Sequence, residues 1–188
     1  GLKALEAPEC NPATDASAPY FLAIEVYLLQ KNYSKMAKML DLAEKRNPDQ
    51  PLELPFKLGD TPVETISEGV EAYRDQEWAK IYNTAVKYIQ KNKIDDAKKK
   101  IETAILIHPK KEENYLTLAA IYIDNQDMDT ALTIANRGLD ADDTSSLLYQ
   151  LKADILLQNN PDKSNMESAK ELYTLAIKCS DDPGPIMR

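Results

Sequence analysis

Few residues in this chain have the chemistry of a catalytic or metal site. The single histidine among the 188 residues is His108, directly before Pro109 at an expected helix end. A lone histidine seldom acts without partners, so we expect a solvent-exposed, helix-terminal residue. Acidic residues gather in three groups, which we interpret as solvated helix faces or helix-start charges: Glu64, Glu68 and Glu71; Glu112 and Glu113; Asp140, Asp142 and Asp143.

The sequence motifs that usually carry enzyme or metal chemistry are absent. There is no Cys-x-x-Cys, no His-x-x-x-His and no calcium-binding loop, and the five glycines are too scattered for a phosphate loop. Cys10 and Cys179 lie near opposite ends, so we expect no intramolecular disulfide in an elongated fold. We therefore predict a protein that is not an enzyme and has no catalytic residues, no metal site and no cofactor.

Charge and hydropathy argue against two further classes of function. The formal net charge of −8 disfavours a nucleic-acid binder, which needs a basic face to meet phosphates. The sequence contains no continuous apolar stretch of the length that a transmembrane helix needs, so we expect no membrane span. With 43% hydrophobic and 29% charged residues, the composition is that of a soluble folded protein, and the scarcity of glycine favours helices.

Small and aromatic residues recur at a fixed spacing of about 34 residues, a period that is typical of a solenoid in which each repeat packs on its neighbours. The same spacing holds in two columns over three units and in three more columns over two units. These repeat columns are Ala85, Ala119 and Ala153; Tyr88, Tyr122 and Leu156; Ala97 and Ala131; Ala104 and Gly138; Pro109 and Asp143.

The last unit departs from this spacing. Its second-helix copies, Ala169, Ala176 and Asp181, each fall four positions later than the spacing predicts. One insertion between Leu156 and Ala169 explains all three shifts. We expect it in the inter-helix turn at 159–165, since lengthening a surface loop costs little closure entropy.

Apolar periodicity and turn signals predict a succession of helices. An N-terminal helix over 16–31 precedes a second helix that begins at the N-cap Ser34 and ends at Arg46. Four prolines make 48–62 an irregular connection, and a separate helix follows from Pro62 to about Asp75. Three antiparallel helical hairpins are then expected: 77–91 with 94–107, 112–125 with 128–139, and 144–158 with 165–179.

These columns resemble those of tetratricopeptide repeat proteins, most clearly over 78–182 and more loosely over 17–50. Lys152 and Met36 depart from the pattern, at an apolar and a small position. The matching residues are, unit by unit, Trp78, Ile81, Thr84, Ala85, Tyr88, Ala97, Ile101, Ala104 and Pro109; Tyr115, Leu118, Ala119, Tyr122, Ala131, Ala135, Gly138 and Asp143; and Tyr149, Ala153, Leu156, Ala169, Tyr173, Ala176 and Asp181.

The resemblance implies an all-α, right-handed α-α superhelix built of helical hairpins, divided into five segments. Residues 1–15 are a loosely ordered lead-in, 16–50 a divergent hairpin, and 51–77 a proline-rich connection plus one helix. Residues 78–182 form three repeat hairpins. We expect 183–188 to begin a further repeat, so that this chain is a fragment whose array continues, because solenoids usually end in a polar capping helix.

In the family, the first helix of each hairpin lines a concave trough. The resemblance implies an apolar trough with an acidic edge, formed by Tyr82, Val86, Ile89, Leu116, Ala120, Ile123, Asp124, Gln150, Asp154 and Leu157. It lacks the Lys, Arg and Asn with which the family's chaperone-tail binders clamp a carboxylate, so we predict against that ligand class. An apolar trough suits an amphipathic helix or an extended segment of another protein. Alternatively, residues 51–77 or another helix fill it.

We therefore expect a non-catalytic scaffold that binds a peptide or helix of a partner protein, without contacting nucleic acid. Two alternatives stay open. The chain could form a homo-oligomer, such as a homodimer, through the ends of the solenoid, or it could be the repeat portion of a larger protein whose activity lies elsewhere. The non-methionine start at Gly1 and the low cysteine content fit a secreted or periplasmic protein, with a slight lean to the bacterial cell envelope, and equally a cytoplasmic fragment.

Overall fold

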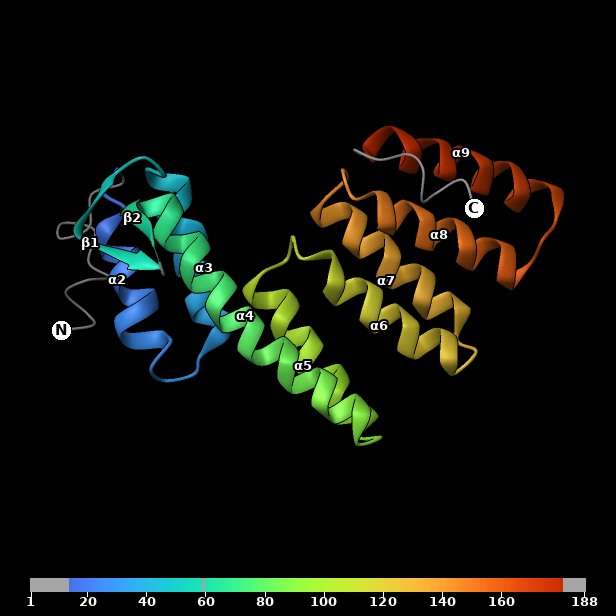
Figure 1. Ribbon diagram of the computed structural model, residues 1–188, viewed down its shortest axis with the longest axis horizontal. Helices are drawn as coiled ribbons and strands as arrows, with labels where there is room; N and C mark the ends of the chain where they lie inside the picture. The colour runs from blue at the N-terminus through green and yellow to red at the C-terminus, as the bar shows by residue number, and fades with distance from the viewer. Residues whose placement is uncertain (1–13, 59, 181–188) are drawn as a thin grey trace. The chain divides into compact units, whose positions relative to one another are not determined.

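The computed structural model describes residues 14–58 and 60–180, which are mostly helical (Figure 1). The chain divides into two compact units. Unit 1 comprises Gly1–Asn83 with Leu106–His108, and unit 2 comprises Thr84–Ile105 with Pro109–Arg188. The all-α repeat fold expected from the sequence is confirmed. No helix among the described residues is long and apolar enough to cross a membrane. The predicted lead-in and the predicted start of a further repeat at 183–188 lie wholly or mostly outside the described residues.

Unit 1 begins with a helical pair and a small hairpin. The α-helix α2 (Ser17–Phe21) continues as the π-helix η2 (Leu22–Tyr27) and packs with α3 (Tyr33–Arg46). The expected N-cap Ser34 is wrong: it lies inside α3, because the side-chain oxygen of Asn32 accepts the Lys35 amide at 3.2 Å and starts the helix earlier.

The predicted irregular connection at 48–62 is also wrong. Residues Pro51–Leu58 form the strand β1, which pairs antiparallel with β2 (Thr61–Thr65) in a two-stranded sheet. Two strands leave every residue on an edge, where a proline without an N–H is tolerated. Buried Leu52 and Val63 anchor the two strands in unit 1.

One long helix, α4 (Ile66–Gln90), replaces the two separate helices expected over 62–75 and 77–91. No proline or glycine interrupts residues 70–90, so nothing in the sequence ends the helix near Asp75. A capping box fixes its start: the Glu68 carboxylate accepts the amides of Glu64 and Thr65 at 2.8 and 3.1 Å. These two bonds lower the pKa of Glu68.

Unit 2 contains the helices that follow, α5 (Ile94–Ile107), α6 (Glu112–Asp124), α7 (Met128–Ala141), α8 (Ser146–Asn159) and α9 (Lys163–Cys179). Only the last residues of α5 belong to unit 1. These elements match the predicted hairpins to within two residues at each end. The alanines of the repeat columns are fully buried. Each of the following is at most 1% exposed: Ala85, Ala119, Ala153, Ala97, Ala131, Ala169, Ala104 and Ala176.

The sequence analysis expected the four-residue insertion in a loop, and this expectation is wrong. Three residues connect α8 to α9, as three connect α6 to α7. Instead, α9 has 17 residues against 14 in α7, and α8 has 14 against 13 in α6. The four extra residues therefore extend the two helices, because helical residues satisfy their own backbone hydrogen bonds.

The same turn joins the helices of three hairpins. Lys31, Asn92 and Gln126 each take a left-handed conformation with φ of 55°, 55° and 61°. The amide of the next residue bonds a carbonyl five residues back in all three: Asn32 to Tyr27, Lys93 to Tyr88 and Asp127 to Tyr122, at 2.8 to 2.9 Å. This hydrogen bond is the Schellman helix ending. The turn thus repeats in the N-terminal hairpin, where the side-chain pattern is weakest.

The left-handed turn at Gln126 yields a first prediction. A side chain in this conformation costs about 1–2 kcal/mol, and glycine avoids that cost while losing some entropy on folding. Gln126→Gly should therefore raise the free energy of unfolding in urea by about 0.5–1 kcal/mol. Gln150→Gly, the same change within the body of α8, should lower it by about 0.5–1 kcal/mol. Destabilisation by Gln126→Gly would contradict the turn geometry.

Candidate functional site

The predicted trough residues fall on three helices in two units. Tyr82 belongs to unit 1, where its ring stacks on Trp78 with centroids 5.2 Å apart. The other nine belong to unit 2: Val86 and Ile89 on the C-terminal part of α4; Leu116, Ala120, Ile123 and Asp124 on α6; and Gln150, Asp154 and Leu157 on α8.

In unit 2, these positions keep part of their surface in solvent. Helices α6 and α8 contact each other, which brings their trough positions onto neighbouring helices. Leu116, Ile123 and Leu157 are half-buried, and Ala120 and Asp124 are exposed. Leu116 and Ile123 pack with one side against the buried core of unit 2. The arrangement is an apolar strip with an acidic neighbour, anchored from beneath by the core.

Asp154 differs from the other trough positions. Its carboxylate accepts a hydrogen bond from the Tyr173 hydroxyl on α9, the second helix of the same hairpin. The pKa of Tyr173 is raised to about 12, mainly because the hydroxyl is partly buried and secondly because of this hydrogen bond. Asp154 is thus held toward α9, and its side chain serves the hairpin contact.

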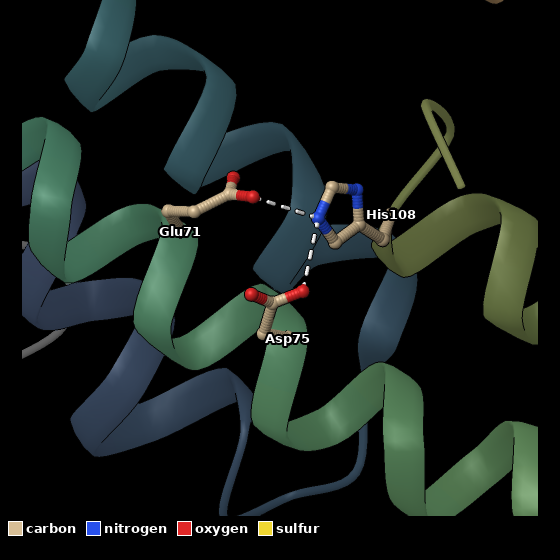
Figure 2. A group of neighbouring side chains, drawn as sticks. All are labelled: Glu71, Asp75 and His108. Carbon is tan, nitrogen blue, oxygen red and sulfur yellow. Dashed lines mark hydrogen bonds and ion pairs between the residues drawn. The ribbon is translucent and has the colours of Figure 1, made fainter. Parts of the chain in front are cut away.

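A second group of polar side chains meets in unit 1 around His108 (Figure 2). The expectation that His108 is solvent-exposed is wrong, since the residue is only 5% exposed. Its Nε2 lies 3.1 Å from Glu71 Oε1 and 3.4 Å from Asp75 Oδ1. Glu71 and Asp75 are four residues apart on α4, so both carboxylates project from one face of the helix. We call these three residues the His108 cluster.

Arg74 holds the chain next to this cluster. Its side chain is buried, and Nη1 donates to the carbonyl oxygen of Ile107, the residue before His108, at 2.6 Å. Its second terminal nitrogen pairs with Asp41 on α3. The guanidinium therefore ties α3, α4 and the segment carrying His108 together within unit 1.

Sequence reasoning missed this cluster because its partners are distant along the chain. Glu71 and Asp75 lie on α4, whereas His108 follows the end of α5, so no local motif joins them. The available signal was the spacing of four between the two carboxylates. It was overlooked because the sequence analysis grouped Glu71 with Glu64 and Glu68 and expected His108 to be exposed.

Comparisons with known proteins give a family match over part of the chain. Residues 88–155 match the family described as tetratricopeptide repeat. The predicted resemblance is thereby confirmed: this protein contains tetratricopeptide repeats in that segment. A comparison with curated proteins gives no match. The tetratricopeptide fold is consistent with a protein–protein interaction scaffold, and such repeats are typically non-catalytic.

The solved structures that match this chain share little sequence with it. The Yersinia enterocolitica type III secretion translocator chaperone SycD is 21% identical with a TM-score of 0.48, covering 58% of this chain and 80% of that one. The first repeat domain of Spaghetti (RPAP3), bound to the HSP90 peptide SRMEEVD, is 14% identical with a TM-score of 0.47, covering 60% and 91%. PilF of Pseudomonas aeruginosa is 13% identical with a TM-score of 0.46, covering 92% and 79%.

The role of Arg74 gives a second prediction. Arg74→Met keeps the apolar stem but leaves the Ile107 carbonyl without its buried donor, so unit 1 should lose about 1–3 kcal/mol of unfolding free energy. Asp41→Asn keeps a side-chain oxygen that can accept from Arg74 at an exposed position, so it should cost less than the loss of the buried Ile107 bond. The fluorescence of Trp78, the single tryptophan and a unit 1 residue, reports the urea transition. Equal losses in both variants would contradict the role assigned to the Ile107 bond.

Proposed function

We propose that unit 2 binds an amphipathic helix or an extended segment of a partner protein. The binding surface comprises Val86, Ile89, Leu116, Ala120, Ile123, Asp124, Gln150 and Leu157, and we call it the trough surface. The observation that carries the proposal is the row of half-buried apolar side chains on the adjacent helices α6 and α8. A partner segment with an apolar stripe would remove the rest of their area from water.

The charges of the trough surface narrow the class of partner. Asp124 is its exposed charged residue, and no Lys or Arg is among its members. The whole chain carries a net charge of −8. A segment with basic residues beside its apolar stripe would therefore associate faster and in a preferred orientation. An acidic peptide tail, which needs a basic clamp, is not the partner we propose.

No catalytic role is part of this proposal. The trough surface contains no nucleophile paired with a base, and the polar bond to Asp154 serves the α8–α9 hairpin. We propose that the protein acts by holding its partner, and that any chemistry belongs to that partner. The division of the chain into five segments, made from the sequence, stays a prediction.

The test uses segments selected from a displayed library of amphipathic helices against the full chain. Ile123→Lys places a charge in the apolar strip, and Ala120→Arg adds bulk at an exposed position without touching the core. Each should weaken the selected segment at least about tenfold, the loss expected when one central contact of about 1.4 kcal/mol is removed. Titration calorimetry measures the affinities, and circular dichroism checks that the variants are folded.

Leu175→Lys provides the matched control. Leu175 is an exposed apolar residue on α9, the second helix of its hairpin, so the same change there should leave segment binding unchanged. Full affinity in Ile123→Lys and Ala120→Arg, with loss in Leu175→Lys, would contradict the trough surface.

Self-association is a second candidate function, which one observation favours. Among the described residues, α9 exposes two large apolar side chains, Met166 at 57% and Leu175 at 38%, whereas α8 exposes Leu147 at 46%. We propose a homodimer through α9 as the alternative. Light scattering over a range of concentrations decides it: a mass that stays monomeric at all concentrations rules self-association out.

A further inference from the structure

The His108 cluster is the group of side chains that the proposed function leaves unused. Figure 2 shows Glu71 and Asp75 reaching from successive turns of α4 toward the same ring nitrogen of His108. All three belong to unit 1, so the cluster forms within one compact body. Two carboxylate oxygens and one imidazole nitrogen are a donor set that binds divalent transition metals.

The distances between the donor atoms fit a small ion. A tetrahedral zinc ion with bonds of about 2.0–2.1 Å places neighbouring ligand atoms about 3.3–3.4 Å apart. Here His108 Nε2 lies 3.1 and 3.4 Å from the two carboxylate oxygens. One ligand atom from each of the three residues lies within 4.8 Å of the others. The two distances from Nε2 are thus close to those between neighbouring ligands of a tetrahedral zinc ion.

The three ligand side chains differ in how far they are buried. The His108 side chain is 6% exposed and has a fixed place, whereas those of Glu71 and Asp75 are 58% and 43% exposed and can turn toward an ion. Both carboxylate residues also line a groove of about 440 Å³ bounded by β2 and the first turns of α4. An ion can enter from solvent on that side, where a water completes four-coordination.

The surrounding structure orients the histidine. The bond from Arg74 to the Ile107 carbonyl fixes the backbone one residue before His108. Arg74 is also the nearest positive charge on α4, and its pairing with Asp41 draws that charge toward α3. The two carboxylates then balance the charge of a divalent ion, as ligating carboxylates do in zinc sites.

We propose that Glu71, Asp75 and His108 bind a divalent transition metal ion, with Zn²⁺ as the best match. Imidazole disfavours the hard cations Mg²⁺ and Ca²⁺, which prefer oxygen ligands alone. The ion would replace the direct contacts between Nε2 and the two carboxylates. The site would strengthen unit 1 by joining α4 to the segment after α5.

The experiment exploits the single histidine. The full chain, with Cys10 and Cys179 replaced by serine so that no thiolate competes, is labelled with ¹⁵N and titrated with ZnCl₂. Imidazole nitrogen spectra then report His108 alone. We expect a saturable shift of the Nε2 resonance at one ion per chain, and a rise in the melting temperature of unit 1, because the ion binds the folded state.

Variants separate this site from adventitious binding. Glu71→Gln and Asp75→Asn, both at partly exposed carboxylates, should each weaken zinc binding at least about tenfold. Glu53→Gln makes the same charge change at an exposed position on β1 and should leave the affinity unchanged. Melting curves in EDTA show that each variant folds without metal. An Nε2 resonance that does not respond to zinc, or equal affinities in all variants, would overturn the proposal and leave an ion-paired imidazole.

Discussion

The close approach of neighbouring helices at small residues is the constraint on which this structure depends. Gly138 shows how tight it is: a Cβ atom there would meet Leu148 Cδ1 at 2.8 Å and Tyr115 Cγ at 2.9 Å. The equivalent positions Ala104 and Ala176 are fully buried. Side chains no larger than a methyl group let the backbones pack closely, and larger residues such as Leu118 and Leu148 fill the core between them.

The long helix α4 contributes to two different bodies of the protein. Its first half carries Glu71, Arg74 and Asp75, which meet the segment around His108 in unit 1. Its last residues supply Ala85 to the core of unit 2. Polar contacts around a buried imidazole stabilise the first body, and apolar repeat packing stabilises the second. The two proposals, metal binding and partner binding, therefore rest on different halves of one helix.

What the sequence predicted well was set by local, periodic interactions. The helices from Ile94 to Cys179 follow from apolar spacing, and the alanines of the repeat columns are buried in the structure. The hairpin at 51–65 was missed because the sequence analysis took four prolines as a sign of an irregular connection. An isolated two-stranded sheet tolerates proline. The insertion was misplaced because sequence alone does not tell a longer loop from longer helices. The His108 cluster was missed because its contacts join distant parts of the chain, α4 and the segment after α5.

Mapping a bound segment on the protein tests most directly whether the first helices of the hairpins form the binding face. Amide chemical shifts of the labelled chain, recorded with and without a selected amphipathic segment, report every helix at once. The account predicts that the largest shifts fall on α6 and α8 at the trough surface, with α7 and α9 little changed. Shifts confined to α7, α9 or the β1–β2 hairpin would contradict it.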